Sequence, residues 1–167
     1  MPRGLKETSS IITIGSAVVE SGANTFTSGR VDLQLNPLDN EVFIVYGIDL
    51  DMVDPDLRAT TTAVNASLST TQRTTVGGLQ DSNVMASNRI TIQSDGTVAV
   101  RGQFASDSSP ATQLEYLGII ATNDFFLNVE GTGNAAAKSL IARVYGVRAK
   151  ADASIYAALV QSELLSA

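Results

Sequence analysis

The chain has 167 residues, enough for one domain with a buried core, and 17% of them are charged against about 25% in typical soluble domains. Its net charge of −6 argues against a dominant nucleic-acid-binding face, since neutralising phosphates requires clustered Lys and Arg. It has no Cys and no His, which excludes disulfides, thiolate metal sites and nucleophiles activated by histidine. Interface cores are depleted of charge, so this composition favours extensive contact with other proteins.

Most segments alternate apolar and polar residues and end at Gly, Asn, Asp or Pro, as β-strands do. In chain order, strands are expected in SSIITIGSAVVE, TFTSGRVDLQL and EVFIVYGIDLDM. The first half of EVFIVYGIDLDM is apolar on both faces, which indicates a strand covered on both sides, and its second half alternates. Strict alternation would place six residues on one face: Val42, Ile44, Tyr46, Ile48, Leu50 and Met52.

The Thr-rich segment that begins at Leu57 is either one strand with a long loop or two short edge strands. NRITIQSDGTVAVRGQF is a hairpin, because Asp-Gly supplies the positive φ that a tight turn requires. Further strands are expected in QLEYLGIIAT, FFLNVE and KSLIARVYGVRAK. ADASIYAALVQSELLSA has helical spacing, with Asp152 or Ser154 as its N-cap. No apolar run approaches the roughly 20 residues that span a bilayer.

These elements predict an all-β fold, an eight-stranded antiparallel β-sandwich of jelly-roll type with a C-terminal α-helix. The predicted organisation is an N-terminal tail (1–10), the sandwich (11–150) and the helix (151–167).

Four aspartates follow one another at the end of the strongest strand: Asp49, Asp51, Asp54 and Asp56. Asp49 and Asp51 are two residues apart on a strand, so both are expected on the face away from the core. Convergent carboxylates could hold Ca²⁺, or they could contact another subunit. The alternative is a solvated strand end with Asp-Pro-Asp starting a turn. No cofactor is expected apart from such a Ca²⁺ ion.

The run from Gly131 to Ala136 matches G-x-G-x-x-A, the phosphate-binding fingerprint of dinucleotide-binding folds. The preceding sequence shows hairpins where that fold requires β-α-β units. A Gly-rich turn between two strands is therefore the favoured interpretation.

Positive charge gathers near the C-terminus, in Arg143, Arg148 and Lys150. These side chains could pair with the aspartates of a neighbouring copy, which would fix the register of an interface. The helix offers apolar residues for docking between subunits, with packing on its own sheet as the alternative. The residues predicted to contact another subunit are Arg143, Arg148, Lys150, Ile155, Tyr156 and Leu159.

With hairpins, a long Thr-rich connection, low charge and neither Cys nor Trp, residues 10–150 resemble a single jelly-roll viral capsid protein in architecture and composition. The resemblance implies a non-enzymatic structural protein of the virion that self-assembles into a closed shell, through pentamers or hexamers. Other capsid proteins or an internal membrane would be further partners. One departure is the start, MPRGLKETSS, which is not the basic arm that many small capsid proteins use to neutralise a genome.

Two other functions stay open. A β-sandwich binding module, such as a carbohydrate-binding, appendage or tail protein, would need exposed aromatic side chains, and aromatic residues make up 5% of the chain. An enzyme would have to use the Asp49–Asp56 cluster with a divalent ion.

Overall fold

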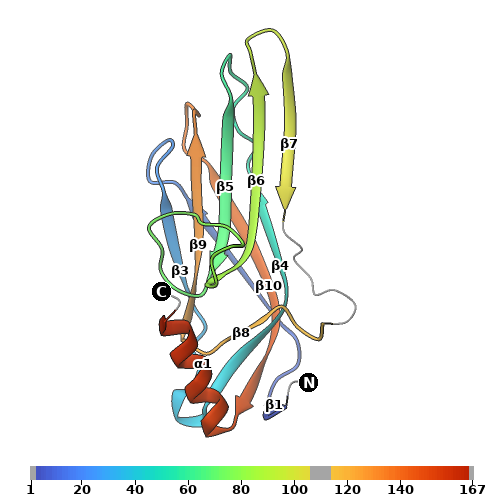
Figure 1. Cartoon of the computed structure of the whole chain (residues 1–167), viewed down its shortest axis with the longest axis vertical. Helices are drawn as coiled ribbons and strands as arrows, with labels where there is room; N and C mark the ends of the chain where they lie inside the picture. The colour runs from blue at the N-terminus through green and yellow to red at the C-terminus, as the bar shows by residue number, and fades with distance from the viewer. Residues whose placement is uncertain (1–2, 106–113, 166–167) are drawn as a thin grey trace.

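The protein is a sandwich of two antiparallel sheets with one helix, as a computed structural model shows for residues 3–105 and 114–165 (Figure 1). The first sheet, sheet A, contains β1 (Leu5–Glu7), β2 (Ile12–Val19), β4 (Glu41–Met52), β8 (Gly118–Ile120) and β10 (Ser139–Ala151). The second, sheet B, contains β3 (Thr27–Asp32), β5 (Thr62–Ser69), β6 (Val84–Ser94), β7 (Ala99–Ala105) and β9 (Asp124–Thr132). A short 3₁₀ helix, η1 (Pro37–Asp39), precedes β4, and α1 (Ala153–Leu165) follows β10.

The pairing of strands has jelly-roll connectivity, as predicted. β2 pairs with β10, β3 with β9, β4 with β8, and β5 with β6, so strands pair from the two ends of the chain inward. A long hairpin rolled up in this way alternates its pairs between two sheets, which gives the orders β2-β10-β4-β8 and β3-β9-β5-β6. β5 lies in the middle of sheet B, so the Thr-rich segment forms one central strand followed by a loop.

The described residues form ten strands, and the prediction of eight is therefore wrong. One addition is β1, which lies within the predicted tail and pairs with the end of β10, because Leu5 is buried in an apolar cluster there. The other strand beyond the eight of a single jelly roll is β7, the second strand of the predicted Asp-Gly hairpin, which lies at the edge of sheet B as its fifth strand. Asp95 closes that turn by accepting hydrogen bonds from the backbone N–H groups of Thr97 and Val98.

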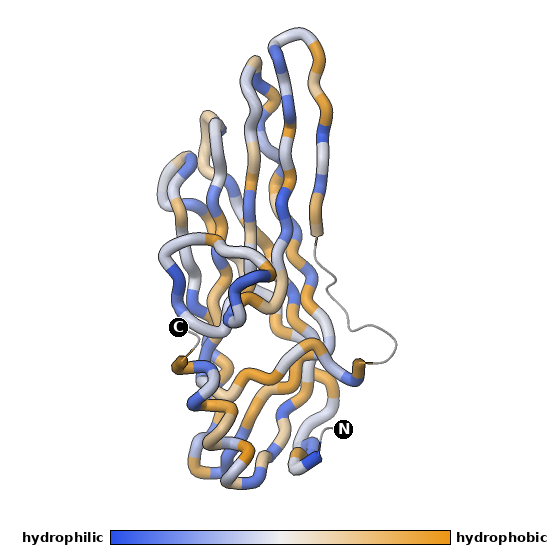
Figure 2. The backbone as a smooth tube through the Cα atoms, viewed as in Figure 1, coloured by the Kyte–Doolittle hydropathy of each residue, from blue (hydrophilic) through white to orange (hydrophobic). Residues whose placement is uncertain are grey.

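The main core lies between the sheets and follows the strand alternation, and Figure 2 shows orange and blue segments interleaved along several of the strands. In β10, Leu140, Ala142 and Val144 face the core, while Ile141 and Arg143 are exposed. The largest fully buried side chains of this core come from both sheets: Phe43, Ile48, Leu68, Ile120, Phe125, Leu127 and Leu140.

β4 changes its buried face midway, which corrects the prediction that alternate residues from Val42 to Met52 share one face. Tyr46 has no cross-strand partner on β10, since Gly47 opposes Tyr145 and Val45 opposes Gly146. One extra residue in a strand exchanges the faces of everything beyond it. Before this bulge, Val42 and Ile44 point away from the main core; after it, Ile48, Leu50 and Met52 point into it. The first half of β4 is covered on both sides, as predicted.

The helix α1 covers the outer face of sheet A over the first half of β4 and the last half of β10 (Figure 1). Ile155, Tyr156, Leu159 and Val160 pack on a second buried cluster formed by Leu5, Val42, Ile44, Ala121, Val147, Ala149 and Ala151. Asp152 caps the helix by accepting a hydrogen bond from the Ile155 N–H at 2.9 Å, so one of the two predicted N-caps is confirmed. Within the described residues, no helix has the length and apolar character needed to cross a membrane.

Glu163 attaches the last turn of α1 to the chain after β8. Its Oε1 accepts a hydrogen bond from the Ala121 N–H at 2.7 Å and its Oε2 accepts one from the Thr122 N–H at 3.1 Å. Burial raises the pKa of the Glu163 carboxyl above its ordinary value, although these hydrogen bonds oppose the shift.

This raised pKa gives Glu163 a defined effect on stability. At pH values between the ordinary pKa of 4.5 and the raised pKa, the folded protein binds more protons than the unfolded protein. The contribution of Glu163 to the free energy of unfolding therefore falls as pH rises. We expect the difference in free energy of unfolding between the wild type and Glu163→Gln to shift in favour of the wild type as pH is lowered from 7 to about 4.5. Urea denaturation at a series of pH values measures it, with exposed Glu7→Gln as the control. A difference that does not change with pH would contradict the prediction.

Candidate functional site

The four predicted aspartates do not converge on one site. Asp49 and Asp51 are exposed on the outer face of β4, as predicted, and Asp49 accepts a hydrogen bond from the Tyr145 hydroxyl at 3.1 Å. Asp54 pairs with Arg101 of β7 at 2.8 Å. In residues 3–105 and 114–165, no three His, Cys, Asp or Glu side chains are grouped so that they could hold a metal ion. The geometry therefore offers Asp49 and Asp51 as surface acids and gives Asp54 a partner within the chain.

Asp56 belongs to a partly buried polar cluster that holds the β9–β10 turn. The Lys138 Nζ donates to Asp56 Oδ1 at 2.6 Å, and the Lys138 side chain is 7% exposed. Asp56 Oδ2 accepts a hydrogen bond from the Ala135 N–H. The hydrogen bond from Lys138 is the main cause that lowers the pKa of Asp56, and the Ala135 N–H adds to it. Asp56 is therefore an anchor for the β9–β10 turn through contacts with Ala135 and Lys138.

The G-x-G-x-x-A run spans the end of β9 and the turn that leads to β10, so the prediction of a Gly-rich turn between two strands is confirmed. Gly133 has φ of 70°, a conformation that favours glycine. Buried Glu20 at the end of β2 accepts hydrogen bonds from the Gly131 N–H at 2.6 Å and the Lys138 N–H at 2.7 Å. The backbone N–H groups that a phosphate-binding loop would present to its ligand are thus used by a carboxylate of the chain.

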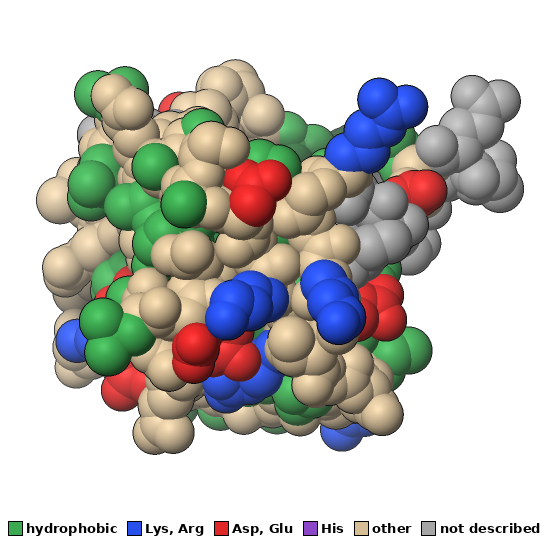
Figure 3. Space-filling view, turned by 90° about the horizontal axis from the view of Figure 1, so that it is seen from below, with side chains coloured by type: hydrophobic (Ala, Val, Ile, Leu, Met, Phe, Trp, Pro, Cys, Tyr) green, Lys and Arg blue, Asp and Glu red, His purple; other side chains and the backbone are tan. Residues whose placement is uncertain are grey.

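Two of the three predicted basic contact residues already have partners in the same chain. Arg148 Nη2 donates to the Leu33 carbonyl oxygen at 2.7 Å, and its Nη1 pairs with Glu41 at 3.1 Å. Lys150 pairs with Asp39 at 3.3 Å. Figure 3, which views the end of the molecule from below, accordingly shows acidic and basic side chains beside one another. Their contact with another subunit stays a prediction.

Arg143 differs from these two. It is exposed on the outer face of β10, directly opposite Asp49 on β4 and Gly15 on β2. Of the helix residues, Ile155, Tyr156 and Leu159 are half-buried against the chain's own sheet. Packing of α1 on its own sheet, the alternative considered from the sequence, is therefore what the structure shows.

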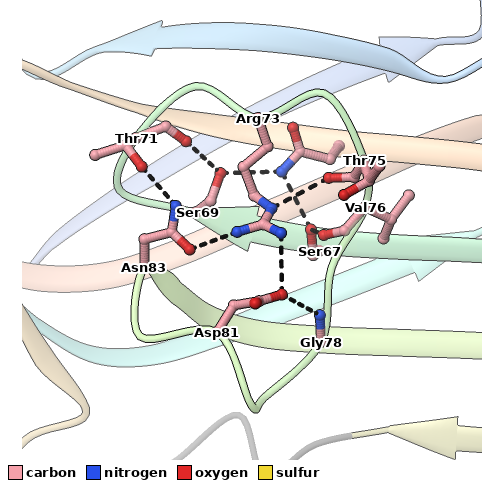
Figure 4. Close-up of polar contacts among 10 residues, drawn as sticks. Ser67, Ser69, Thr71, Arg73, Thr75, Val76, Gly78, Asp81 and Asn83 are labelled. Atoms are coloured by element: carbon pink, nitrogen blue, oxygen red, sulfur yellow. Dashed lines mark hydrogen bonds and ion pairs between the residues drawn. The ribbon is translucent and has the colours of Figure 1, made fainter. Parts of the chain in front are cut away.

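The loop between β5 and β6 is organised by Arg73, which the sequence analysis did not single out (Figure 4). The guanidinium donates to the Asn83 side chain at 2.6 Å, to Asp81 at 2.9 Å and to the Thr75 carbonyl oxygen at 3.1 Å. The loop lies across the outer face of sheet B, where Ser67 donates to the Val76 carbonyl oxygen. A single arginine within a Thr-rich segment was the only signal in the sequence.

The strand β7, at the edge of sheet B, is an exposed surface feature without an evident role in the monomer. Six of its seven residues are exposed, and Gly102 is half-buried. Val100 is 61% exposed and Phe104 72%, and Val98 just before the strand is 64% exposed. Apolar side chains on an unpaired edge are the usual mark of a site that pairs with another chain.

Comparisons with known proteins add little to this geometry. No protein-family model matches the chain, and no curated protein matches it. Among solved structures, one similar chain is tailspike protein gp49 from Acinetobacter baumannii bacteriophage Fri1, a capsular polysaccharide depolymerase. The match covers 71% of this chain and 19% of the tailspike, with 14% sequence identity and a TM-score of 0.17. A similarity this low supports no conclusion about function, so the conclusion from structure is an all-β jelly-roll sandwich with an exposed edge strand.

Proposed function

We propose that this protein is a structural protein of a virion, whose copies assemble into a capsid or a similar closed shell without catalysis. The supporting observation is the exposed apolar edge strand β7 on a jelly-roll sandwich. Jelly rolls occur in viral capsids but also in lectins and cupins, so the architecture alone does not decide between them. An exposed edge strand with apolar side chains and a single charged residue tends to pair with other chains, which is unfavourable for a monomer but useful for a subunit, and this favours assembly.

Other surfaces fit the same proposal. Asp49, Asp51 and Arg143 lie exposed on the outer face of sheet A, where they can pair with charges of a neighbouring copy. Such pairs fix orientation more than they add affinity. The partners are copies of this chain, arranged as pentamers or hexamers, with other shell proteins or an internal membrane as further neighbours.

The alternative is a β-sandwich binding module of a tail or appendage. Sugar-binding faces usually present aromatic rings. Among the described residues, Phe104 of β7 is the one aromatic residue whose side chain is largely exposed. A lone ring on an unpaired edge fits strand pairing better than a sugar platform.

The mass of the purified particle tests the proposal. Light scattering after size exclusion, with negative-stain images of the same fraction, should show pentamers, hexamers or megadalton shells. Ammonium sulfate should promote assembly, because salting-out salts strengthen the burial of apolar surface. A 17.5 kDa monomer at all protein and sulfate concentrations would refute assembly, and a glycan-binding screen would then test the alternative.

A further inference from the structure

The strand β7 ends sheet B, and no other strand in residues 3–105 and 114–165 pairs with its free edge. It is seven residues long, contains no proline and has one charged residue, Arg101. β3, the opposite edge of the same sheet, carries Arg30 and Asp32, and Arg30 forms ion pairs with Asp32 and Asp124. Charge of this kind discourages edge-to-edge pairing, and β7 has little of it.

The pairing with β6 assigns each β7 side chain to a face. Phe104 lies opposite Arg89 and Val100 opposite Gln93, both on the outer, polar face of β6. Gln103 and Arg101 lie on the inner side, opposite Ile90 and Ile92. Val100 and Phe104 therefore lie on the outer face of a hairpin that projects beyond the body of the sandwich, and Val98, just before the strand, is also exposed (Figure 1).

We propose that β7 pairs antiparallel with β7 of a second copy, across a two-fold axis that passes through Gly102, so that two B sheets become one continuous sheet. The inference rests on the proposed self-assembly and names one of its contacts. Isologous contacts of this type place the same surface of both copies against each other.

The strand itself specifies this register. A two-fold axis perpendicular to a sheet places residues of the same face opposite each other. Centring on Gly102 is the choice that overlaps the whole of Ala99–Ala105 in both copies. It sets Val100 of each copy opposite Phe104 of the other, and Arg101 opposite Gln103. Centring on Arg101 would instead place two like charges opposite each other, which is unfavourable.

A pairing of seven residues per strand is small for a stable interface, which usually buries about 800 Å² on each partner. The β7 contact is therefore expected to act together with other contacts in an assembly. Its test must report on β7 directly as well as on particle mass.

A single cysteine provides that direct report, because the chain has none of its own. A Cβ added at Gly102 would have its nearest neighbour, Thr91 Oγ1, at 3.4 Å, so the position accommodates a Cβ in ordinary contact. In the proposed register two such cysteines face each other with Cα atoms about 4.5–5.5 Å apart, within disulfide reach. In Val100→Cys, the matched control, the two cysteines are four residues apart along the strand, roughly 13 Å. Mild oxidation should cross-link Gly102→Cys into dimers and leave Val100→Cys mostly monomeric.

Charge complementation tests the same register in assembly. Val100→Lys/Phe104→Lys places lysine opposite lysine twice, and Val100→Glu/Phe104→Glu does the same with glutamate. Each double variant alone should associate more weakly, on the order of tenfold, and an equimolar mixture should recover the loss. Recovery on mixing cannot come from a folding defect. Leu38→Lys, at an exposed apolar residue of η1 and outside sheet B, is the control and should assemble normally.

The outcomes separate this inference from the proposed function. If the wild type assembles while Gly102→Cys fails to cross-link and both charged variants assemble normally, the β7 contact is wrong and self-assembly stands. If Gly102→Cys cross-links and mixing rescues dimers but no larger particle forms, the β7 contact stands and the shell is wrong. A wild type that remains monomeric, with no cross-linking, overturns both.

Discussion

Replacing Gly146 by Ala is expected to lower the free energy of unfolding by about 2–4 kcal/mol. A Cβ at this position would overlap the backbone carbonyl oxygen of Ile44 and would lie 2.7 Å from the ring of Phe43. Neither neighbour can move easily, because β4 and β10 are paired on both sides of this point and Phe43 is fully buried. The substitution would also disturb the bulge at Tyr46 that exchanges the buried face of β4.

The control for this prediction is Gly15→Ala on β2, the strand next to β10. A Cβ there has its nearest neighbour, the Ala142 carbonyl oxygen, at 4.0 Å, and it points to solvent. Since Ala restricts the unfolded chain more than Gly, this change should be neutral or slightly stabilising. Urea denaturation followed by circular dichroism compares the two. Equal stability of Gly146→Ala and Gly15→Ala would show that the close packing around Gly146 does not exclude a methyl group.

Replacing Glu20 by Ala is expected to have the second large effect, a loss of about 2–4 kcal/mol. Glu20 is 4% exposed, and its carboxylate accepts hydrogen bonds from the Gly131 and Lys138 N–H groups. Removing it leaves two buried donors without an acceptor, and each costs about 1–3 kcal/mol. Hydrogen exchange should show the β9–β10 turn losing protection, along with a lower urea midpoint.

The control is Glu7→Ala, in which an exposed glutamate loses one hydrogen bond from the Tyr46 hydroxyl. We expect its effect to stay within about 0.5 kcal/mol, as for most surface substitutions. If Glu20→Ala were as mild as Glu7→Ala, water would have to replace the lost acceptor, and Glu20 would not be the anchor of the turn.

Local pattern predicted most of the strands and the helix of this protein. Period-two alternation places Ile141 and Arg143 away from the core and Leu140 and Ala142 in it, and the structure agrees. The alternation failed at β4, because a bulge is one residue whose conformation depends on the neighbouring strand. The sequence shows that both faces of the first half of β4 are apolar. The structure gives the reason, because α1 covers the face that carries Val42 and Ile44.

The candidate sites were predicted less well than the fold. Strand spacing was enough to put Asp49 and Asp51 on the outer face. The partners of Asp54 and Asp56 are Arg101 and Lys138, which lie 47 and 82 residues further along the chain. No local pattern indicates which cation will reach which acid over such distances.

The β-rich class, the hairpin at Asp95-Gly96 and the C-terminal helix could be predicted from the sequence, because each depends on residues close together in the chain. The tertiary structure decided that β1 belongs to sheet A, that α1 packs on its own sheet and that β7 is an open edge. An apolar residue on a strand is drawn to burial whether the covering surface comes from its own chain or from another copy. In the sequence, Val100 and Phe104 therefore resemble core residues. Only the tertiary structure of the single chain shows that nothing in its described residues covers them.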